Sequence, residues 1–364
     1  MKTKKHTSRT ATKTPERDLY QLVTDRVVTA IENGVPPWKR PWRSARNGVG
    51  LPEMMPANAL TGKLYTGVNV LLLWLAADEA GYVSNDWLTY RQAQQLGGHV
   101  RKGEVATLAV IYKDWKKQAV DEHGNRLTYR QAQQLGGHVR KGEVATLAVI
   151  YKDWKKQAVD EHGNRLTDSE GEPLMEIVPV LKSNPLFNVG QCDGLPEHLM
   201  VKAEGSADAL PADTFSERVL QVLNGSGVSV SSLPQDRAFY RPDLDRIVMP
   251  LSSQFDQVAD YWTTLLHELV HSTGHEKRLR RVGISTFTGR NSPEYAFEEL
   301  IAEMGSAFLC AHLGIAGDVQ HESYIDGWLK VLKSDKKALF RACRQAREAS
   351  EYLLTRRTSQ ECAA

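Results

Sequence analysis

The sequence predicts an α+β protein, with an N-terminal domain that mixes helices and strands followed by a mainly helical domain. Three observations predict this class. The 364 residues, 41% hydrophobic and 25% charged, are enough for two ordinary globular cores. Residues 105–115 have the β-branched and aromatic content of a strand, whereas residues 258–274 and 293–313 repeat apolar side chains at helical spacing. A run of small and polar residues, 197–211, separates the two halves.

We therefore predict a disordered basic tail over residues 1–16, a first domain over 17–200 and a second domain over 208–357. Turn and capping signals set the expected elements within each domain. In the first domain these are helices 15–33, 70–80 and 90–96 and strands 105–115 and 175–181. In the second they are helices 213–223, 257–273, 293–313, 322–332 and 335–354 and two short strands within 238–250. The expected N-caps are Asp256 for helix 257–273, Ser292 for helix 293–313 and Ser334 for helix 335–354.

One segment of the first domain occurs twice. Residues 88–126 are repeated without a change as residues 127–165. Two copies are too few for a solenoid, which needs at least about three repeats. Because one fold has one place for this segment, we predict one docked copy and one copy that is looped out or extends the sheet.

The second domain carries an H-E-x-x-H motif. On a helix, residues four apart lie on one face, so His267 and His271 can hold one metal ion between them. Glu268 lies beside them, where a general base for a metal-bound water is placed. The alternative is an amphipathic core helix whose histidines are packed or hydrogen-bonded. The buried-helix context favours a metal site, with zinc or another divalent metal such as manganese as cofactor.

A catalytic zinc usually has three protein ligands. His275 comes two residues too early for the extended motif with a third histidine, so we reject it. On the next predicted helix we favour Glu299 as the third ligand, with Glu298 and Glu303 as alternatives. Glu299 and Glu303 lie four apart on one side of this helix, and we expect Glu298 to point off the other side. We expect Glu303 to orient the metal-binding residues.

A tryptophan-rich segment of the first domain suits nucleic acid. In residues 36–48, Trp38 and Trp42 alternate with cations, and single-stranded nucleic acid offers bases that stack on rings and phosphates that pair with cations. The alternative is that the tryptophans fill an edge of the core. The predicted contacts are Trp38, Trp42 and Tyr65 for bases, and Arg40, Arg43, Lys63, Arg101 and Lys102 for phosphates.

The composition argues against several other classes. The four cysteines include no C-x-x-C pair, which argues against a disulfide framework or a cysteine zinc site. The basic, polar start lacks the apolar core of a secretory signal. The longest apolar run, residues 68–77, is far shorter than the roughly 20 residues that span a bilayer. We therefore expect a cytoplasmic protein without a membrane partner.

Several motifs resemble one known family. PWKRPW, PANALTGKLYTGVN, WLTYRQAQQLGGHVRKGE and LFNVGQ resemble the single-stranded-DNA-binding domain of ArdC-type antirestriction proteins. YRPDLDRIVMP, YWTTLLHELVHSTG, YAFEELIAEMGSAF and YIDGWLKVLKSDKKALF are similar to the zincin-like metallopeptidase domain of that family. The resemblance implies a plasmid-encoded protein that binds single-stranded DNA and shields incoming DNA from restriction during conjugation. It also implies a metal motif at His267, Glu268, His271 and a downstream glutamate.

Two functional hypotheses follow from these observations. In the first, an antirestriction protein binds single-stranded DNA. In the second, a metal-dependent peptidase acts on a host protein that the sequence does not identify, and the N-terminal domain targets it. A purely structural metal site is a third interpretation, but such sites usually have four protein ligands, often cysteines.

Overall fold

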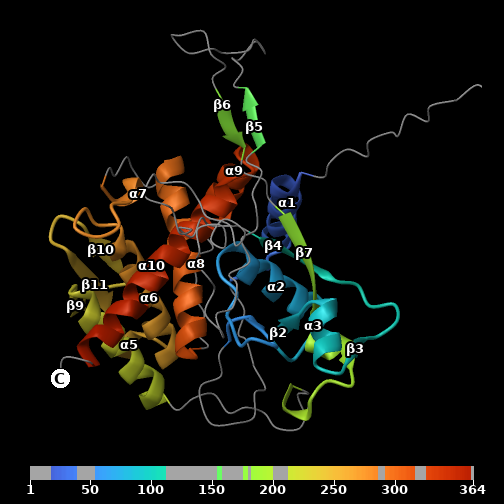
Figure 1. Cartoon of the computed structure of the whole chain (residues 1–364). Coiled ribbons are helices and arrows are strands. Elements are labelled where there is room, and N and C mark those ends of the chain that lie inside the picture. The colour runs from blue at the N-terminus through green and yellow to red at the C-terminus, as the bar shows by residue number, and fades with distance from the viewer. Residues whose placement is uncertain are drawn as a thin grey trace, which may run out of the picture. The chain divides into compact units, whose positions relative to one another are not determined.

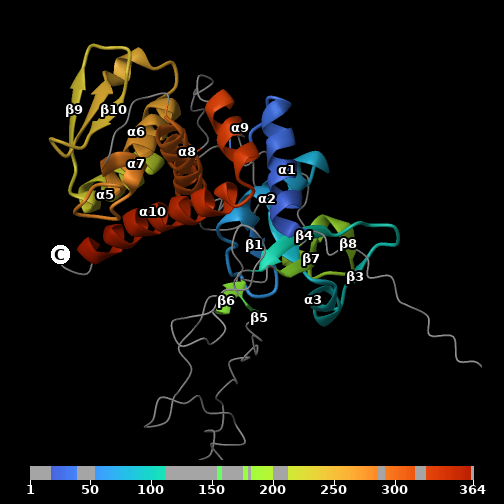
Figure 2. The same cartoon turned by 90° about the horizontal axis from the view of Figure 1, so that it is seen from above.

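A computed structural model describes residues 18–38, 54–111, 154–157, 175–178, 182–199, 212–285, 292–315 and 325–361 (Figures 1 and 2). It divides into two compact units, Met1–Val110 with Ser183–Ala364, and Ile111–Lys182. The architecture is α+β, as predicted. Within the described residues, no helix combines the length and apolar character that a membrane crossing needs.

The N-terminal part of the first unit is built on a four-stranded sheet in the order β1-β2-β7-β4. Helix α2 packs on this sheet, since Leu73, Ala76 and Ala77 share a core cluster with Trp87 of β2, Ala109 of β4 and Leu186 of β7. A second sheet pairs β3 with β8. The elements of this part are α1 (Leu19–Glu32), β1 (Ala57–Asn58), α2 (Val68–Glu79), β2 (Asp86–Leu88), α3 (Tyr90–Gln95), β3 (His99–Val100), β4 (Thr107–Ile111), β7 (Lys182–Asn188), η1 (Val189–Gln191), β8 (Cys192–Asp193) and η2 (Glu197–Leu199).

Helices dominate the C-terminal part, beside one three-stranded sheet in the order β10-β11-β9. Helix α8 packs against α6, α9 and α10. A Cβ atom on Gly305 of α8 would come within 2.9 Å of the Val270 side chain on α6, so only glycine allows these two helices to approach this closely. The elements are α5 (Ala212–Ser226), β9 (Ser229–Leu233), β10 (Phe239–Arg241), β11 (Arg246–Pro250), η3 (Ser252–Gln254), α6 (Val258–Thr273), α7 (Val282–Ser285), α8 (Pro293–Leu313), α9 (Ile325–Ser334) and α10 (Ala338–Glu361).

The two parts share one core within the first unit. The Trp74 ring of α2 lies 6.0 Å from the Phe308 ring of α8, and the Met54 backbone N–H donates to Ala311 O at 3.4 Å. Helix α1 packs against α9. The Thr24 hydroxyl of α1 donates to Lys336 O at 2.9 Å. The predicted domain boundary lies at residues 201–207, outside the described residues, and so stays a prediction, as does the tail over residues 1–16.

Most elements form where the sequence predicts them, and the differences concern helix caps and one strand. The α1 N-cap is Asp18, whose carboxylate accepts from the backbone N–H groups of Tyr20 and Gln21. The α6 N-cap is Gln257 rather than Asp256. Ser334 was predicted to cap the last helix, but it ends α9, and its hydroxyl donates to Val331 O. Strand β9 was not predicted, because its sequence SVSSL is polar. It forms by parallel pairing with β11.

The described residues use different parts of the two repeat copies. The first copy supplies Leu88, α3, β3 and β4 of the first unit. The second supplies β5 (Trp154–Gln157), which pairs antiparallel with β6 (Met175–Val178) in the second unit. Only the first copy follows Trp87, which is fully buried in the sheet core, so the second copy cannot supply this attachment. The prediction of one docked copy and one looped or sheet-extending copy stays a prediction, because residues 112–153 and 158–165 lie outside the described residues.

A single-copy variant tests whether the duplication contributes to the fold. Deleting residues 112–150 joins Ile111 to Tyr151 and restores one copy, while every described element keeps its residues. We expect the variant to be as stable as the full chain or more stable by on the order of 1 kcal/mol, because the connection before β5 becomes short. Thermal unfolding of both proteins measures this. A marked loss of stability would show that the deleted residues pack against the fold.

Candidate metal centre

Helix α6 brings the two motif histidines together. His267 and His271 lie one turn apart, both are buried, and their Nε2 atoms are 3.1 Å apart. The helix forms because its apolar face, which includes Leu265, Leu266 and Leu269, is fully buried in the core. The histidines thus converge on one point inside the protein rather than on the surface.

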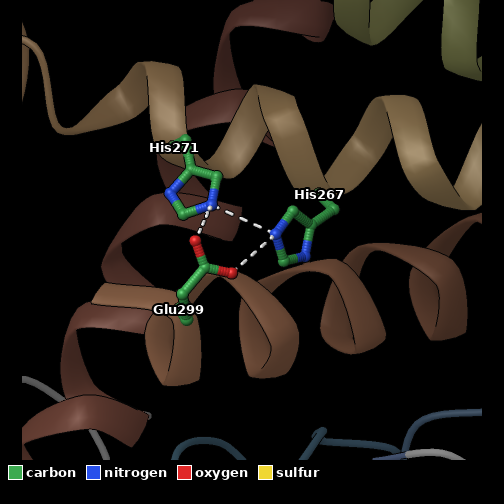
Figure 3. Close-up of side chains that lie close together, drawn as sticks. All are labelled: His267, His271 and Glu299. Carbon is green, nitrogen blue, oxygen red and sulfur yellow. Dashed lines mark hydrogen bonds and ion pairs between the residues drawn. The ribbon is translucent and has the colours of Figure 1, made fainter. Parts of the chain in front are cut away.

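Helix α8 places Glu299 opposite this pair (Figure 3). Its Oε2 lies 3.5 Å from His267 Nε2 and its Oε1 lies 3.5 Å from His271 Nε2. Ligand bonds of about 2.0 to 2.2 Å to one tetrahedral ion would place ligand atoms about 3.3 to 3.6 Å apart. One ligand atom each from His267, His271 and Glu299 lie within 4.8 Å of one another, so this triangle could hold a zinc-sized divalent ion, with further positions for water or substrate.

The alternative ligands lie on the far sides of the histidine rings. Glu303 Oε1 is 3.9 Å from His267 Nδ1, the side of that ring opposite Nε2, which suits the predicted orienting role. Glu298 Oε1 is 3.3 Å from His271 Nδ1. The prediction that Glu298 points away from the site was wrong, because this side chain is buried against His271. Gly283 of α7 and Arg281 from the loop before it cover Glu298. His275 Nδ1 accepts the backbone N–H of Lys277 at 3.2 Å and is not part of the cluster.

The charges of the cluster are balanced internally. Burial lowers the pKa of His271, but the carboxylates of Glu299 and Glu298 outweigh burial and raise that pKa well above its usual value. Burial raises the pKa of Glu299, but the two histidines outweigh it and hold the pKa well below the ordinary range. Without a metal, the buried carboxylate is thus neutralised by imidazolium, and a bound cation would take over that role.

Glu268 lies in the same buried region without joining the triangle. Burial raises its pKa, while the neighbouring histidines oppose this shift. The backbone of Tyr240, on the edge strand β10, lies close enough to this carboxylate to oppose the rise in its pKa as well. A carboxyl group with a raised pKa beside a metal site is suited to accept and return a proton.

A side-chain clamp holds β10 near α6. The Arg278 guanidinium pairs with Asp245 and donates to Tyr240 Oη at 3.1 Å, and its Nε donates to Ser272 O at 2.7 Å. The Tyr240 hydroxyl in turn donates to Asp245 Oδ1 at 2.7 Å. Sequence reasoning missed this clamp, since Arg278 lies 33 residues from Asp245 and outside the quoted motifs.

The predicted nucleic-acid contacts separate into three groups. Trp38 is only 6% exposed, and its ring meets the Trp328 ring edge-on at 5.7 Å. It fills the core, as the alternative interpretation had it, and presents no face for base stacking. Arg40, Trp42 and Arg43 lie outside the described residues. Lys63 and Lys102 are exposed, and Tyr65 is half-buried. Arg101 is exposed but paired with Glu104 at 2.8 Å and Asp193 at 3.5 Å.

The structure adds two residues that sequence reasoning did not single out. Tyr90, at the start of α3, is 49% exposed, and no other described aromatic side chain is more than about a third exposed. Arg91 beside it is also exposed. The signal available in the sequence was a tyrosine followed by an arginine in the repeated segment.

Family models match both parts of the chain. One, the N-terminal domain of the anti-restriction factor ArdC, matches residues 17–127 and also residues 122–189, and the two matches overlap where the repeat copies meet. Another, a zincin-like metallopeptidase, matches residues 217–345. The crystal structure of the antirestriction protein ArdC from plasmid R388 in its metal-free form is 33% identical, with a TM-score of 0.64 over 94% of this chain and 98% of that one. The chain belongs to the ArdC antirestriction family.

Other relatives of this family member extend the comparison. The Mn(II)-bound structure of R388 ArdC is similar at 33% identity, with a TM-score of 0.63 over 93% of this chain and 98% of that one. A DNA primase TraC of Escherichia coli is 31% identical over 93% of this chain but only 20% of the primase, and a second is 30% identical and matched over 27%. An uncharacterised protein of Sinorhizobium fredii, y4eC, is 29% identical over 94% of each chain. The chain thus spans about a quarter or less of the primases' length.

The raised pKa values of His267 and His271 predict the pH dependence of metal binding. A metal must displace the protons that Glu299 helps these rings to hold, so affinity should be highest above their pKa values and fall as the pH decreases. The decline should begin above the ordinary histidine pKa of about 6.5. Titration of the metal-free protein with Mn²⁺ at a series of pH values measures this. An affinity that does not change with pH would contradict the charge balance described above.

Proposed function

We propose that this protein binds single-stranded DNA through its N-terminal part and protects that DNA from restriction during conjugation, with a divalent metal held by His267, His271 and Glu299. The observation that carries the proposal is the match over nearly the whole chain to an antirestriction protein, together with the triangle of ligand atoms on α6 and α8. The metal-bound form of that relative contains Mn(II). A zinc-like spacing of the ligand atoms also allows Zn²⁺, so both metals are candidates.

For DNA, the exposed residues around α3 form the best-supported face. Tyr90 offers a ring on which a base can stack, and Arg91 and Lys63 offer charges to the phosphates. Asn58 links these residues. Its side chain exchanges hydrogen bonds with Gln92 of α3 at 3.1 and 3.2 Å, and its backbone N–H donates to Lys63 O at 2.9 Å.

The α3 side of this face is rigid. Thr89 and Gln92 form a capping box, in which the Gln92 N–H donates to the Thr89 hydroxyl and the Thr89 N–H donates to the Gln92 side chain. Tyr90 packs edge-on against Phe187 of β7. A preorganised face loses little conformational entropy when a strand binds, which supports its use as a DNA contact surface.

A peptidase is the second candidate function, with a host protein as substrate. The observation that favours it is Glu268, which is buried beside the triangle with the backbone of edge strand β10 close to its carboxylate. A bound divalent metal would polarise a peptide carbonyl and acidify water. Glu268 would take up the proton and return it to the leaving amine, while the edge of β10 would align an extended peptide.

DNA binding by the full chain tests the first candidate. We expect preference for single strands over duplex and an affinity that falls steeply with salt. Tyr90→Ala with Tyr129→Ala, the same position in the second copy, should cost about 1–3 kcal/mol of binding free energy because a stacking platform is lost. Lys63→Glu should weaken binding, whereas Lys330→Glu, an equal charge change on α9, should not. Equal affinity for both DNA forms, or unchanged affinity in the tyrosine variant, would contradict this assignment.

Glu268→Gln separates the two candidate functions. The substitution removes the proton acceptor but none of the three proposed ligands, so we expect wild-type Mn²⁺ and DNA binding. If DNA binding carries the function, protection of plasmid transfer into a restricting host should also stay at the wild-type level. Loss of protection with metal and DNA binding intact would instead favour the peptidase.

A further inference from the structure

A buried ion pair lies directly behind the metal-site histidine His271. The Arg281 guanidinium contacts both oxygens of Glu298, with Nη2–Oε1 at 2.6 Å and Nε–Oε2 at 2.9 Å. Both residues are at least 95% buried. Neither coordinates the proposed ion, since the near atom of Glu298 meets His271 Nδ1, opposite the Nε2 that faces Glu299.

Arg281 also binds the end of the metal helix. Its Nη2 donates to Val270 O at 2.7 Å, and its Nη1 donates to the Thr273 hydroxyl at 2.6 Å. Carbonyls in the last turn of a helix lack partners within the helix, so this guanidinium satisfies an acceptor at the C-terminus of α6. One side chain therefore ties α6, which carries both histidines, to α8, which carries Glu298 and Glu299.

The backbone of α7 packs closely over the Glu298 side of this pair. A Cβ atom on Gly283 of α7 would lie 2.7 Å from the Glu298 Cβ, so glycine is required where α7 covers α8. This cover excludes water from the pair, and exclusion of water strengthens the hydrogen bond from His271 to Glu298.

We propose that Arg281 is a positioning residue of the metal centre that acts through Glu298 on His271. The guanidinium fixes the Glu298 carboxylate, which only accepts hydrogen bonds, so His271 Nδ1 must donate its N–H to it. Nδ1 is thereby unavailable to the metal, and Nε2 is directed at the ion with the ring orientation fixed. This inference rests on the proposed metal site and adds residues that lie outside the H-E-x-x-H motif.

Mn²⁺ affinity of the full chain, measured by calorimetry, tests the proposal. Losing the partner of a ligating histidine typically costs about 10–100-fold in metal affinity, so Glu298→Met should weaken binding by that factor. Because Arg281 acts through Glu298, Arg281→Met should weaken binding in the wild type but add little in the Glu298→Met background. The proposal would be overturned if Arg281→Met weakened Mn²⁺ binding by the same factor in both backgrounds, or if Glu298→Met bound Mn²⁺ with wild-type affinity.

The single variants leave a buried charge without its partner and can unfold, so a matched pair of double variants carries the same test. Arg281→Met with Glu298→Gln keeps a hydrogen-bond acceptor for His271, whereas Arg281→Met with Glu298→Met does not. We expect the glutamine form to bind Mn²⁺ at least 10-fold more tightly than the methionine form. Thermal unfolding in the presence of a chelator confirms that both are folded.

Equal affinities of the two double variants, with wild-type protein that binds Mn²⁺, would refute the positioning role alone. A wild-type protein that binds no Mn²⁺ and no Zn²⁺, with His267→Ala as the reference for absent binding, would refute the metal centre itself and this inference with it.

Discussion

The site depends on how closely α6 and α8 approach each other. The histidines come from one helix and the glutamate from the other, so the ligand triangle exists only at one separation and one rotation of the pair. Gly305 allows that separation by accepting the Val270 side chain against its backbone. Cores are close-packed and adjust only partially, so a larger residue at this crossing would push the ligand atoms apart.

Electrostatics imposes the second constraint. Glu298, Glu299 and Glu303 are all buried on consecutive turns of α8, a placement that costs several kcal/mol per charge unless partners are supplied. The partners come from other elements, namely His271 and His267 of α6 and Arg281 from the loop before α7. Such an arrangement is poorly explained as a means of stabilising the fold, because apolar residues would pack there at less cost. It is well explained as preparation for a cation.

Sequence reasoning reached the metal cluster because its signals are local. The spacing of His267 and His271 is a helix-face pattern, and Glu299 lies on a helix whose start is marked by Ser292 and a proline. It failed where partners are distant in the chain. The burial of Trp38 depends on Trp328, the inward turn of Glu298 depends on Arg281, and β9 depends on β11, none of which shows in a window of neighbouring residues. The exposure of Tyr90 was also not predicted, because exposure depends on how the rest of the chain packs around a residue.

The shared core of the two parts has a consequence for how such proteins evolve. Trp74 packs against Phe308, Trp38 packs against Trp328, and Met54 bonds to the end of α8. Separating the two parts would expose these large apolar surfaces, because each part covers the contact surface of the other. We therefore expect the part that resembles a DNA-binding domain and the part that resembles a peptidase to be inherited together. The two primases match 93% of this chain within a far longer protein, so regions similar to both parts occur together there.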